Sequence, residues 1–309
     1  MILGSINPAV LLAALMVAAT PILLAAIGEL VVEKAGVLNL GVEGMMIMGA
    51  CVGFIVAVNT GSPIIGFFGA ALGGVALSLL FALLTQALMT NQVASGLALT
   101  LFGLGLTALL GQRYVGITPP RTPKLDLGPL SDIPFLGRAL FTHDIVVYLT
   151  IALVGAVWWF LKYSRAGMIL RAVGENHDAA HALGYHVKRV RVLAIMFGGA
   201  CAGLGGAYLS LIRVPQWTEG MTVGAGWIAL ALVVFASWRP WRAMAGAYLF
   251  GGVVVLQLNL QAAGVRIPVE YLSMSPYLIT ILVLVIISSG KGRSLNAPGS
   301  LNKPFHASS

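Results

Sequence analysis

The class of this protein is decided by one stretch that contains no Asp, Glu, Lys or Arg, GMMIMGACVGFIVAVNTGSPIIGFFGAALGGVALSLLFALLTQALMTNQVASGLALTLFGLGLTALLGQ at residues 44–112. A helix of about 20 apolar residues spans the hydrocarbon core of a bilayer. An uncharged run of 69 residues therefore has to cross a membrane more than once. Gly61, Ser62 and Pro63 supply one point at which the chain can reverse. The stretch predicts several transmembrane helices.

The composition of the whole chain agrees with a membrane location. Apolar residues make up 59% of the 309 residues and charged residues only 9%, whereas soluble domains carry about 25% charge. The chain is therefore too apolar for a water-facing surface, and too poor in charge for disorder. Cys51 and Cys201 both lie in apolar runs, which excludes a disulfide scaffold and a thiolate metal site. We attribute the net charge of +8 to cytoplasmic loops rather than to a nucleic-acid surface.

Nine apolar segments are separated by Gly, Pro and charged residues. We predict an all-α, polytopic membrane protein with about nine spans, within a range of eight to ten. Residues 1–290 form the transmembrane domain, and the polar tail at 291–309 is expected to be disordered. Segment 222–237 would be only about 24 Å long, and 37–58 opens with polar residues, so both are expected to be broken helices. The segments are 8–28, 37–58, 64–88, 92–112, 144–161, 192–212, 222–237, 243–263 and 275–289.

The distribution of basic residues predicts an orientation. Of the 18 Lys and Arg residues, twelve lie on the side of the membrane that carries the loop at 162–191, and six lie on the other. Because cytoplasmic loops are enriched in Lys and Arg, we expect this loop and the C-terminus inside the cell, and the N-terminus outside. With this topology the similar stretches 69–75 and 246–253 run in opposite directions, which allows an inverted repeat.

The most informative polar stretch is RAGMILRAVGENHDAAHALG at residues 165–184, between the fifth and sixth segments. Asn176 can cap a short helix that carries Asp178 in its first turn. The small residues that follow would give this helix a smooth surface that fits a groove on another protein, and a solvated connecting loop is the alternative. His177 and His181 have zinc-ligand spacing, but no third ligand stands out and solvated histidines are expected.

Two motifs carry a resemblance to a known family. The stretch GELVVEKAGVLNLGVEGMMIMGA at 28–50 resembles the signature of the branched-chain amino acid and simple-sugar permease family, and its nucleoside branch is the most similar. Asp178-Ala-Ala-x-x-x-Gly184 resembles the EAA loop with which ABC-importer permeases contact their ATPase subunit. Asp replaces the Glu of that motif, and its later Leu-Pro is absent. Stretches 91–96, 226–231 and 256–261 fit the same branch.

The resemblance implies the membrane-spanning permease subunit of a bacterial ABC importer in the inner membrane. Its solute would be small and polar, most simply a nucleoside, with a simple sugar such as a pentose as the alternative. Implied partners are an ATPase subunit, a second permease subunit in a heterodimer, and an extracytoplasmic substrate-binding protein. The chain lacks a Gly-x-x-x-x-Gly-Lys-Ser/Thr loop, so ATP would be bound by the partner. No enzymatic activity, cofactor or metal is expected of this chain.

The family resemblance assigns a coupling role to the loop at 163–190. Reversed charge at its acids, or a bulky side chain in place of its last glycine, would then uncouple transport from ATP hydrolysis. The residues expected to take part in this coupling are Arg171, Glu175, Asp178, Ala179, Ala180 and Gly184.

Polar residues within apolar segments are the candidates for the solute pathway. Glu43 is ionisable at membrane depth, and an ionisable residue at that depth indicates a functional role by default. The alternative is a structural role, in which Glu43 bonds backbone amides near a helix cap. Trp227 either stacks a nucleobase or anchors its helix at the membrane interface. The candidates are Asn39, Glu43, Asn91, Gln92, Ser95, Trp227, Gln257 and Asn259.

Two other classes of protein stay open. An ion-coupled secondary transporter would use Glu43 and the broken helices and would need no ATPase. Co-purification of an ATPase subunit therefore distinguishes an ABC permease from an ion-coupled transporter. An intramembrane serine hydrolase needs a His base near its serine. All five histidines lie outside the apolar segments, which argues against this third class.

Overall fold

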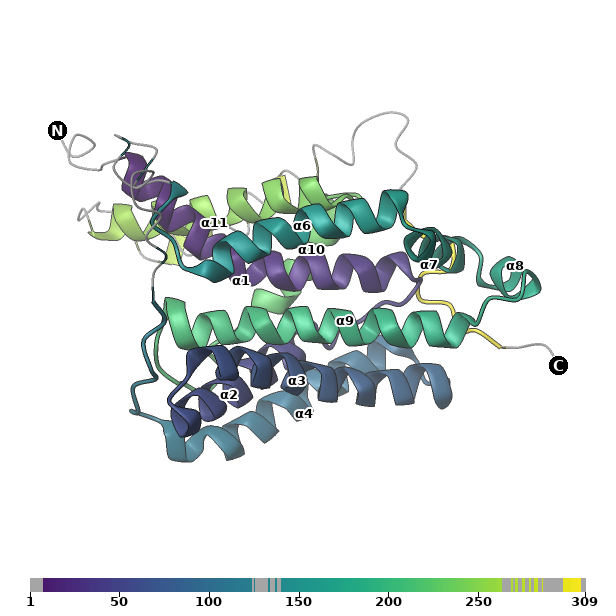
Figure 1. Cartoon of the computed structure of the whole chain (residues 1–309), viewed down its shortest axis with the longest axis horizontal. Coiled ribbons are helices and arrows are strands. Elements are labelled where there is room, and N and C mark those ends of the chain that lie inside the picture. The colour runs from purple at the N-terminus through teal and green to yellow at the C-terminus, as the bar shows by residue number, and fades with distance from the viewer. Residues whose placement is uncertain are drawn as a thin grey trace.

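Long helices lying side by side form the described part of the chain, which contains no strand (Figure 1). The structure is a computed structural model. It describes residues 8–123, 125, 133, 137, 140–262, 268, 270–271, 274–275, 278, 281–282, 285 and 297–306.

Seven of the described helices are long and apolar enough to cross a membrane, which confirms the predicted class of polytopic helical protein. They correspond to the first six predicted segments and the eighth. The helices are α1 (Pro8–Lys34), α2 (Val42–Thr60), α3 (Pro63–Ala82) with a π-helical continuation over Leu83–Ala87, α4 (Gln92–Gly111), α6 (Ile145–Tyr163), α9 (Val187–Tyr208) with a π-helical continuation over Leu209–Arg213, and α11 (Pro240–Ala262).

The two remaining segments have different outcomes. Segment 222–237 contains α10 (Ala225–Phe235), a helix of 11 residues. At 1.5 Å per residue it extends about 16 Å, roughly half of the bilayer core, so the prediction of a short helix is confirmed. Segment 275–289 falls largely on residues outside the described part of the chain. The inverted repeat also stays a prediction.

Helix α9 lies between α1 and the pair α2 and α3 (Figure 1). Glycines allow this close approach. A Cβ built on Gly203 would lie 2.3 Å from the Ala70 carbonyl oxygen on α3, and one built on Gly49 of α2 would lie 2.2 Å from the Gly203 Cα. Three helix backbones therefore meet at Gly203, where a larger residue cannot fit, as is typical of helix packing in membranes.

The first span is longer than its uncharged run predicted. Helix α1 continues six residues past Gly28 to Lys34, and the additional turns bury Glu29 and Glu33, each 1% exposed. The prediction that the span ends at 28 was wrong because both carboxylates receive hydrogen bonds inside the protein. Asn39 donates to Glu29, and the Trp238 indole donates to Glu33.

Candidate functional site

The predicted coupling loop folds into two short helices at one end of the bundle, α7 (Arg165–Glu175) and α8 (His177–Ala182). Helix α8 projects beyond the long helices (Figure 1). The Asn176 side-chain oxygen accepts hydrogen bonds from the backbone N–H groups of Asp178, at 3.1 Å, and Ala179, at 3.0 Å. This N-cap confirms the prediction made from the sequence.

The residues predicted on the coupling surface divide into exposed and buried positions. Asp178 is 78% exposed, Ala179 is also exposed, and Gly184 ends α8 in the left-handed region at φ +86° with open space around its Cβ position. Ala180 is 2% exposed, so its assignment to the docking surface was wrong. Its methyl group points inward, where it packs with Val173, Val187 and Phe305.

One exposed apolar residue beside α8 was not predicted from the sequence. Leu183 is 75% exposed and precedes the left-handed turn at Gly184. The sequence signal that could have indicated this exposed residue is an isolated Leu in a polar loop. Together with Asp178 and Ala179 it gives α8 an acidic, small and apolar exposed surface.

Arg171 and Glu175 lie on α7, apart from the exposed surface of α8. Both line a cavity of about 730 Å³, which Lys34 at the end of α1 and Arg239 before α11 also line. The Glu175 carboxylate accepts a hydrogen bond from the Gly299 N–H at 3.1 Å. The two residues therefore lie where α7 meets the ends of the spans and the C-terminal residues.

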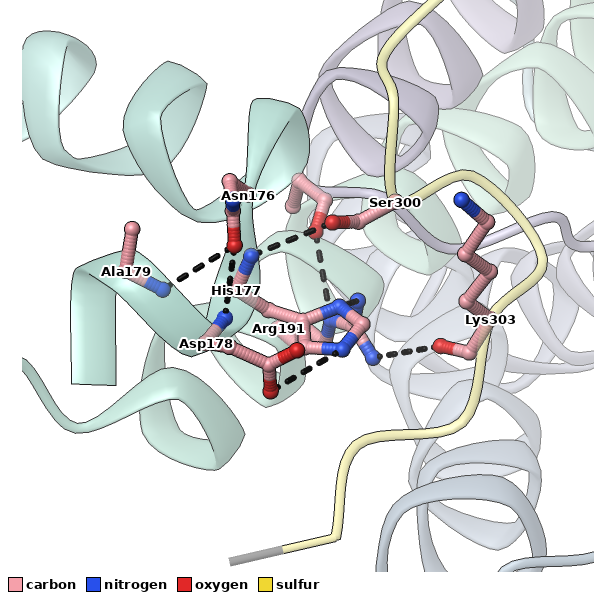
Figure 2. Close-up of polar contacts among 8 residues, drawn as sticks. Asn176, His177, Asp178, Ala179, Arg191, Ser300 and Lys303 are labelled. Atoms are coloured by element: carbon pink, nitrogen blue, oxygen red, sulfur yellow. Dashed lines mark hydrogen bonds and ion pairs between the residues drawn. The ribbon is translucent and has the colours of Figure 1, made fainter. Parts of the chain in front are cut away.

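Arg191 is a buried hub that the sequence reasoning counted only among the basic loop residues. Its side chain is 0% exposed at the start of α9. The guanidinium donates to the backbone oxygens of Ala35, at 3.3 Å, and Lys303, at 3.1 Å, and its third contact is the His177 Nδ1 at 3.2 Å (Figure 2). One side chain thus joins the end of α1, the C-terminal residues and the start of α8.

His177 is buried rather than solvated, contrary to expectation, at 8% exposed. Burial is the larger cause that lowers its pKa, and the positive charge of Arg191 lowers the pKa further. Because Arg can only donate, the His177 Nδ1 accepts, which leaves the proton on Nε2, 3.4 Å from a carboxylate oxygen of Asp178. The described residues contain no cluster of three metal-ligating side chains.

The connection between α1 and α2, at 35–41, is irregular backbone that is largely buried. Inside a membrane protein such backbone groups need partners. The Leu38 N–H donates to the Gln92 side chain at 2.8 Å, and the Asn39 N–H donates to Glu29 at 3.2 Å. Gln92 and Asn39 thus support the fold of this connection.

Glu43 anchors the buried end of the short helix α10. Its carboxylate accepts one hydrogen bond from the Thr222 hydroxyl at 2.6 Å and one from the Gly226 N–H at 2.8 Å, and the side chain is 4% exposed. A carboxylate at this position complements the positive end of a helix dipole. The bond to backbone amides foreseen as an alternative is therefore present, although the amide belongs to α10 and not to α2.

The other pathway candidates have local partners or are exposed. Asn91 caps α4 through the Ala94 N–H at 3.0 Å, and Ser95 bonds the Thr90 hydroxyl at 2.7 Å. Trp227 is 47% exposed on α10. Asn259 donates to the Val255 oxygen at 2.8 Å within α11, which also carries Gln257. Contact with a solute stays a prediction for all eight candidates.

Two buried acids of α1 were missed because they were assigned to a loop. Glu33 accepts a hydrogen bond from the Trp238 indole at 2.6 Å, and its second oxygen is buried without a hydrogen-bond partner among the described residues. Glu29 and Glu33 are four residues apart and therefore share a helix face. This spacing was the signal for a longer first helix.

Membrane-length helices, a short helix anchored at its buried end, and a helical loop beyond the spans are the features of a polytopic transport protein. The comparison with known families gives the assignment. The chain belongs to the family described as branched-chain amino acid transport system, permease component, which matches residues 11–287.

Individual relatives agree with this family. The chain is 45% identical to a putative glucose ABC transporter permease protein of Haloferax volcanii, over 89% of this chain and 90% of that protein. It is 32% identical to a guanosine ABC transporter permease protein of Bacillus subtilis, over 89% and 91%. A nucleoside ABC transporter permease protein of Lactococcus lactis is 30% identical, over 94% and 95%. No solved structure matches the chain. The relatives place it among permease subunits of the sugar and nucleoside type.

Proposed function

We propose that this permease subunit imports a nucleoside across the cytoplasmic membrane, driven by ATP hydrolysis in a separate ATPase subunit. The nucleoside assignment draws on the motifs at 28–50 and 91–96 and on the two relatives named for guanosine and nucleosides. A free sugar is the second candidate, because the relative with 45% identity is named for glucose. Both candidates share a polyhydroxylated ring.

The single observation that carries the coupling proposal is the geometry of α8. A capped helix of six residues projects beyond the spans and exposes Asp178, Ala179 and Leu183. A short helix with a small and apolar surface fits a groove on a rigid partner, and we assign that groove to the ATPase. Helices α6 and α9 flank the α7–α8 loop in the chain, so movement of α8 would reach both spans.

The remaining parts of the system follow from the family. A second permease subunit would complete the pathway as a heterodimer, and a substrate-binding protein would deliver the solute from outside. We place the N-terminus outside the cell and the C-terminus in the cytoplasm. Closure of the ATPase dimer would then switch the bundle between two states that open to opposite sides. ATP would be held by the ATPase, and this chain would need no cofactor.

The proposal is tested by uptake into vesicles that contain the complete complex. Labelled guanosine, uridine, ribose and glucose are offered with the binding protein, with and without ATP. We expect ATP-dependent uptake of a nucleoside, with unlabelled sugars competing poorly. Uptake that follows an ion gradient without nucleotide would refute the ABC assignment, and uptake of glucose alone would select the second candidate.

The coupling surface is tested in the same vesicles by charge reversal at Asp178, because this exposed acid lies on α8. We expect Asp178→Arg to reduce ATP-driven uptake at least tenfold while the permease still folds. Glu219→Arg is the matched control, since Glu219 is also an exposed acid but lies beyond the opposite end of α9. Uptake by Asp178→Arg that equals the uptake of the wild type and of Glu219→Arg would contradict the role of α8.

A further inference from the structure

The C-terminal residues 297–306, hereafter the C-terminal strap, are bonded to the junction between α7 and α8 (Figure 2). The Ser300 N–H donates to the Gly174 backbone oxygen at 2.8 Å, and the Ser300 hydroxyl accepts from the His177 N–H at 3.1 Å. The first N–H groups of a helix have no partner within that helix. Ser300 therefore completes, from 123 residues away, the cap that Asn176 begins.

An apolar contact fastens the far end of the strap. Phe305 is 5% exposed, and its ring centroid lies 5.4 Å from that of His177 and 5.2 Å from that of His181, both in edge-on geometry. It shares a buried cluster with Val173 of α7 and Ala180 of α8. The expectation of a disordered tail was thus wrong for 297–306, because one aromatic side chain in this polar tail is buried under α8.

Arg191 connects the strap to the transmembrane bundle. Its guanidinium bonds the Lys303 backbone oxygen in the strap and the Ala35 backbone oxygen after α1. A buried guanidinium needs acceptors for its N–H groups, and a loss of one leaves a buried donor unsatisfied. The strap is therefore held on both sides, by α8 through Ser300 and Phe305, and by the bundle through Arg191.

Helix α8 is too short to hold its own position. It has six residues, whereas isolated helices shorter than about 12 residues are marginal in water. We infer that the C-terminal strap positions α8 and forms one coupling surface with it, so that efficient drive by the ATPase requires residues 297–306. This inference depends on the proposed function for its ATPase partner, but the positioning of α8 can be measured without that partner.

The first test compares two truncated chains. One ends after 296 and lacks the strap, and the matched control ends after 306 and keeps it. In the purified permease, hydrogen exchange is followed at the amides of 176–183. We expect exchange at least tenfold faster in the chain that ends after 296, while the amides of α2 and α9 stay protected. Unchanged exchange at 176–183 would overturn the positioning role, whatever the ATPase does.

Single substitutions keep the inference testable if the shorter chain does not fold. Ser300→Ala removes the cap of the His177 N–H, and Phe305→Ala removes the buried ring, whereas Phe305→Leu retains an apolar side chain. We expect faster exchange in both alanine variants and recovery in Phe305→Leu. His306→Ala is the control, because His306 is an exposed residue of the strap.

The second test measures coupling in the complete complex as solute moved per ATP hydrolysed. We expect this ratio to fall at least fivefold without the strap, and to stay at the wild-type value in the chain that ends after 306. A wild-type ratio without the strap would overturn its part in the coupling surface. A wild-type complex that shows no ATP-driven uptake would instead refute the proposed function, and the exchange measurement would still judge the positioning of α8.

Discussion

Replacing Glu43 tests whether this buried acid serves the fold or the transport chemistry. Both of its oxygens accept hydrogen bonds at the buried start of α10, one from the Thr222 hydroxyl and one from the Gly226 N–H. Gln has the same shape, so in Glu43→Gln its carbonyl oxygen can accept from Gly226 while its amide donates to the Thr222 oxygen. Ala removes both acceptors. The two substitutions therefore differ in hydrogen bonding at the same position.

The magnitudes follow from these contacts. Each buried donor left without an acceptor costs about 1–3 kcal/mol, and Thr222 is 2% exposed. Two such donors in Glu43→Ala predict a loss of about 4 kcal/mol in the free energy of unfolding. Glu43→Gln keeps one acceptor oxygen of the two, so one buried donor loses its acceptor, which costs about 2 kcal/mol. Thr222→Val also removes one bond and is expected at about the same 2 kcal/mol.

Two measurements check this order. Unfolding of the purified permease in lipid nanodiscs should show a loss of stability in Glu43→Gln and in Thr222→Val that is about half of the loss in Glu43→Ala. In vesicles with the complete complex, Glu43→Gln should keep most of the ATP-driven uptake because α10 stays anchored. A Glu43→Gln protein as unstable as Glu43→Ala would refute the anchoring role. A stable Glu43→Gln protein without uptake would show that the charge itself acts in transport, as an ion-coupled carrier requires.

Three further predictions concern other buried groups. Trp238→Phe removes the donor to Glu33 and should cost about 2 kcal/mol of stability, with Trp241→Phe as the exposed control. Gly203→Val should prevent stable folding, whereas Gly105→Ala, with open space around its Cβ position, should not. Acid should loosen α8. Burial is the largest cause that lowers the pKa of His177 in the fold; Arg191 and Lys303 lower it further, and Asp178 raises it. The folded protein therefore binds this proton more weakly than the unfolded chain does. The stability that the neutral imidazole contributes is present above about pH 6.5 and is lost as the pH falls below that value. The protection factors of the amides at 176–183, which correct for the slower intrinsic exchange in acid, should fall below about pH 6.5, and this fall should be absent in His177→Gln.

The spans were predictable because they depend on one simple quantity. An uncharged run of about 20 residues directly indicates a segment that is buried in lipid. Seven of the predicted segments correspond to membrane-length helices. The cap at Asn176 was also predictable, because it involves neighbours in the sequence. The burial of Ala180 was not, since it depends on Phe305, which is 125 residues away in the chain. Local patterns cannot report such contacts.

Four of the errors concern polar side chains near the ends of spans, and two of these, Glu29 and Arg191, share one physical cause. Glu29, Glu33, Arg191 and His177 were all assigned to solvated loops, yet each is buried. They lie near the ends of spans, where helices stop and irregular backbone begins within the protein. Such backbone has no water to bond, so it needs charged or polar side chains as partners. Arg191 bonds the backbone oxygen of Ala35, and Glu29 bonds the backbone N–H of Asn39, at the two ends of the same buried connection.

A charged residue near the end of a span therefore has one of two different roles in this protein. A residue such as Asp178, exposed on α8, serves contact with water or a partner. A residue such as Arg191 replaces water for the backbone and joins elements that are distant in the sequence. Composition cannot separate the two, because both are counted as charge outside an apolar run. The hydrogen-bond partners of each residue separate the two roles. Arg191 joins the end of α1, the start of α8 and the C-terminal strap in one bonded unit. Through this unit a displacement of α8 would act on the connection before α2.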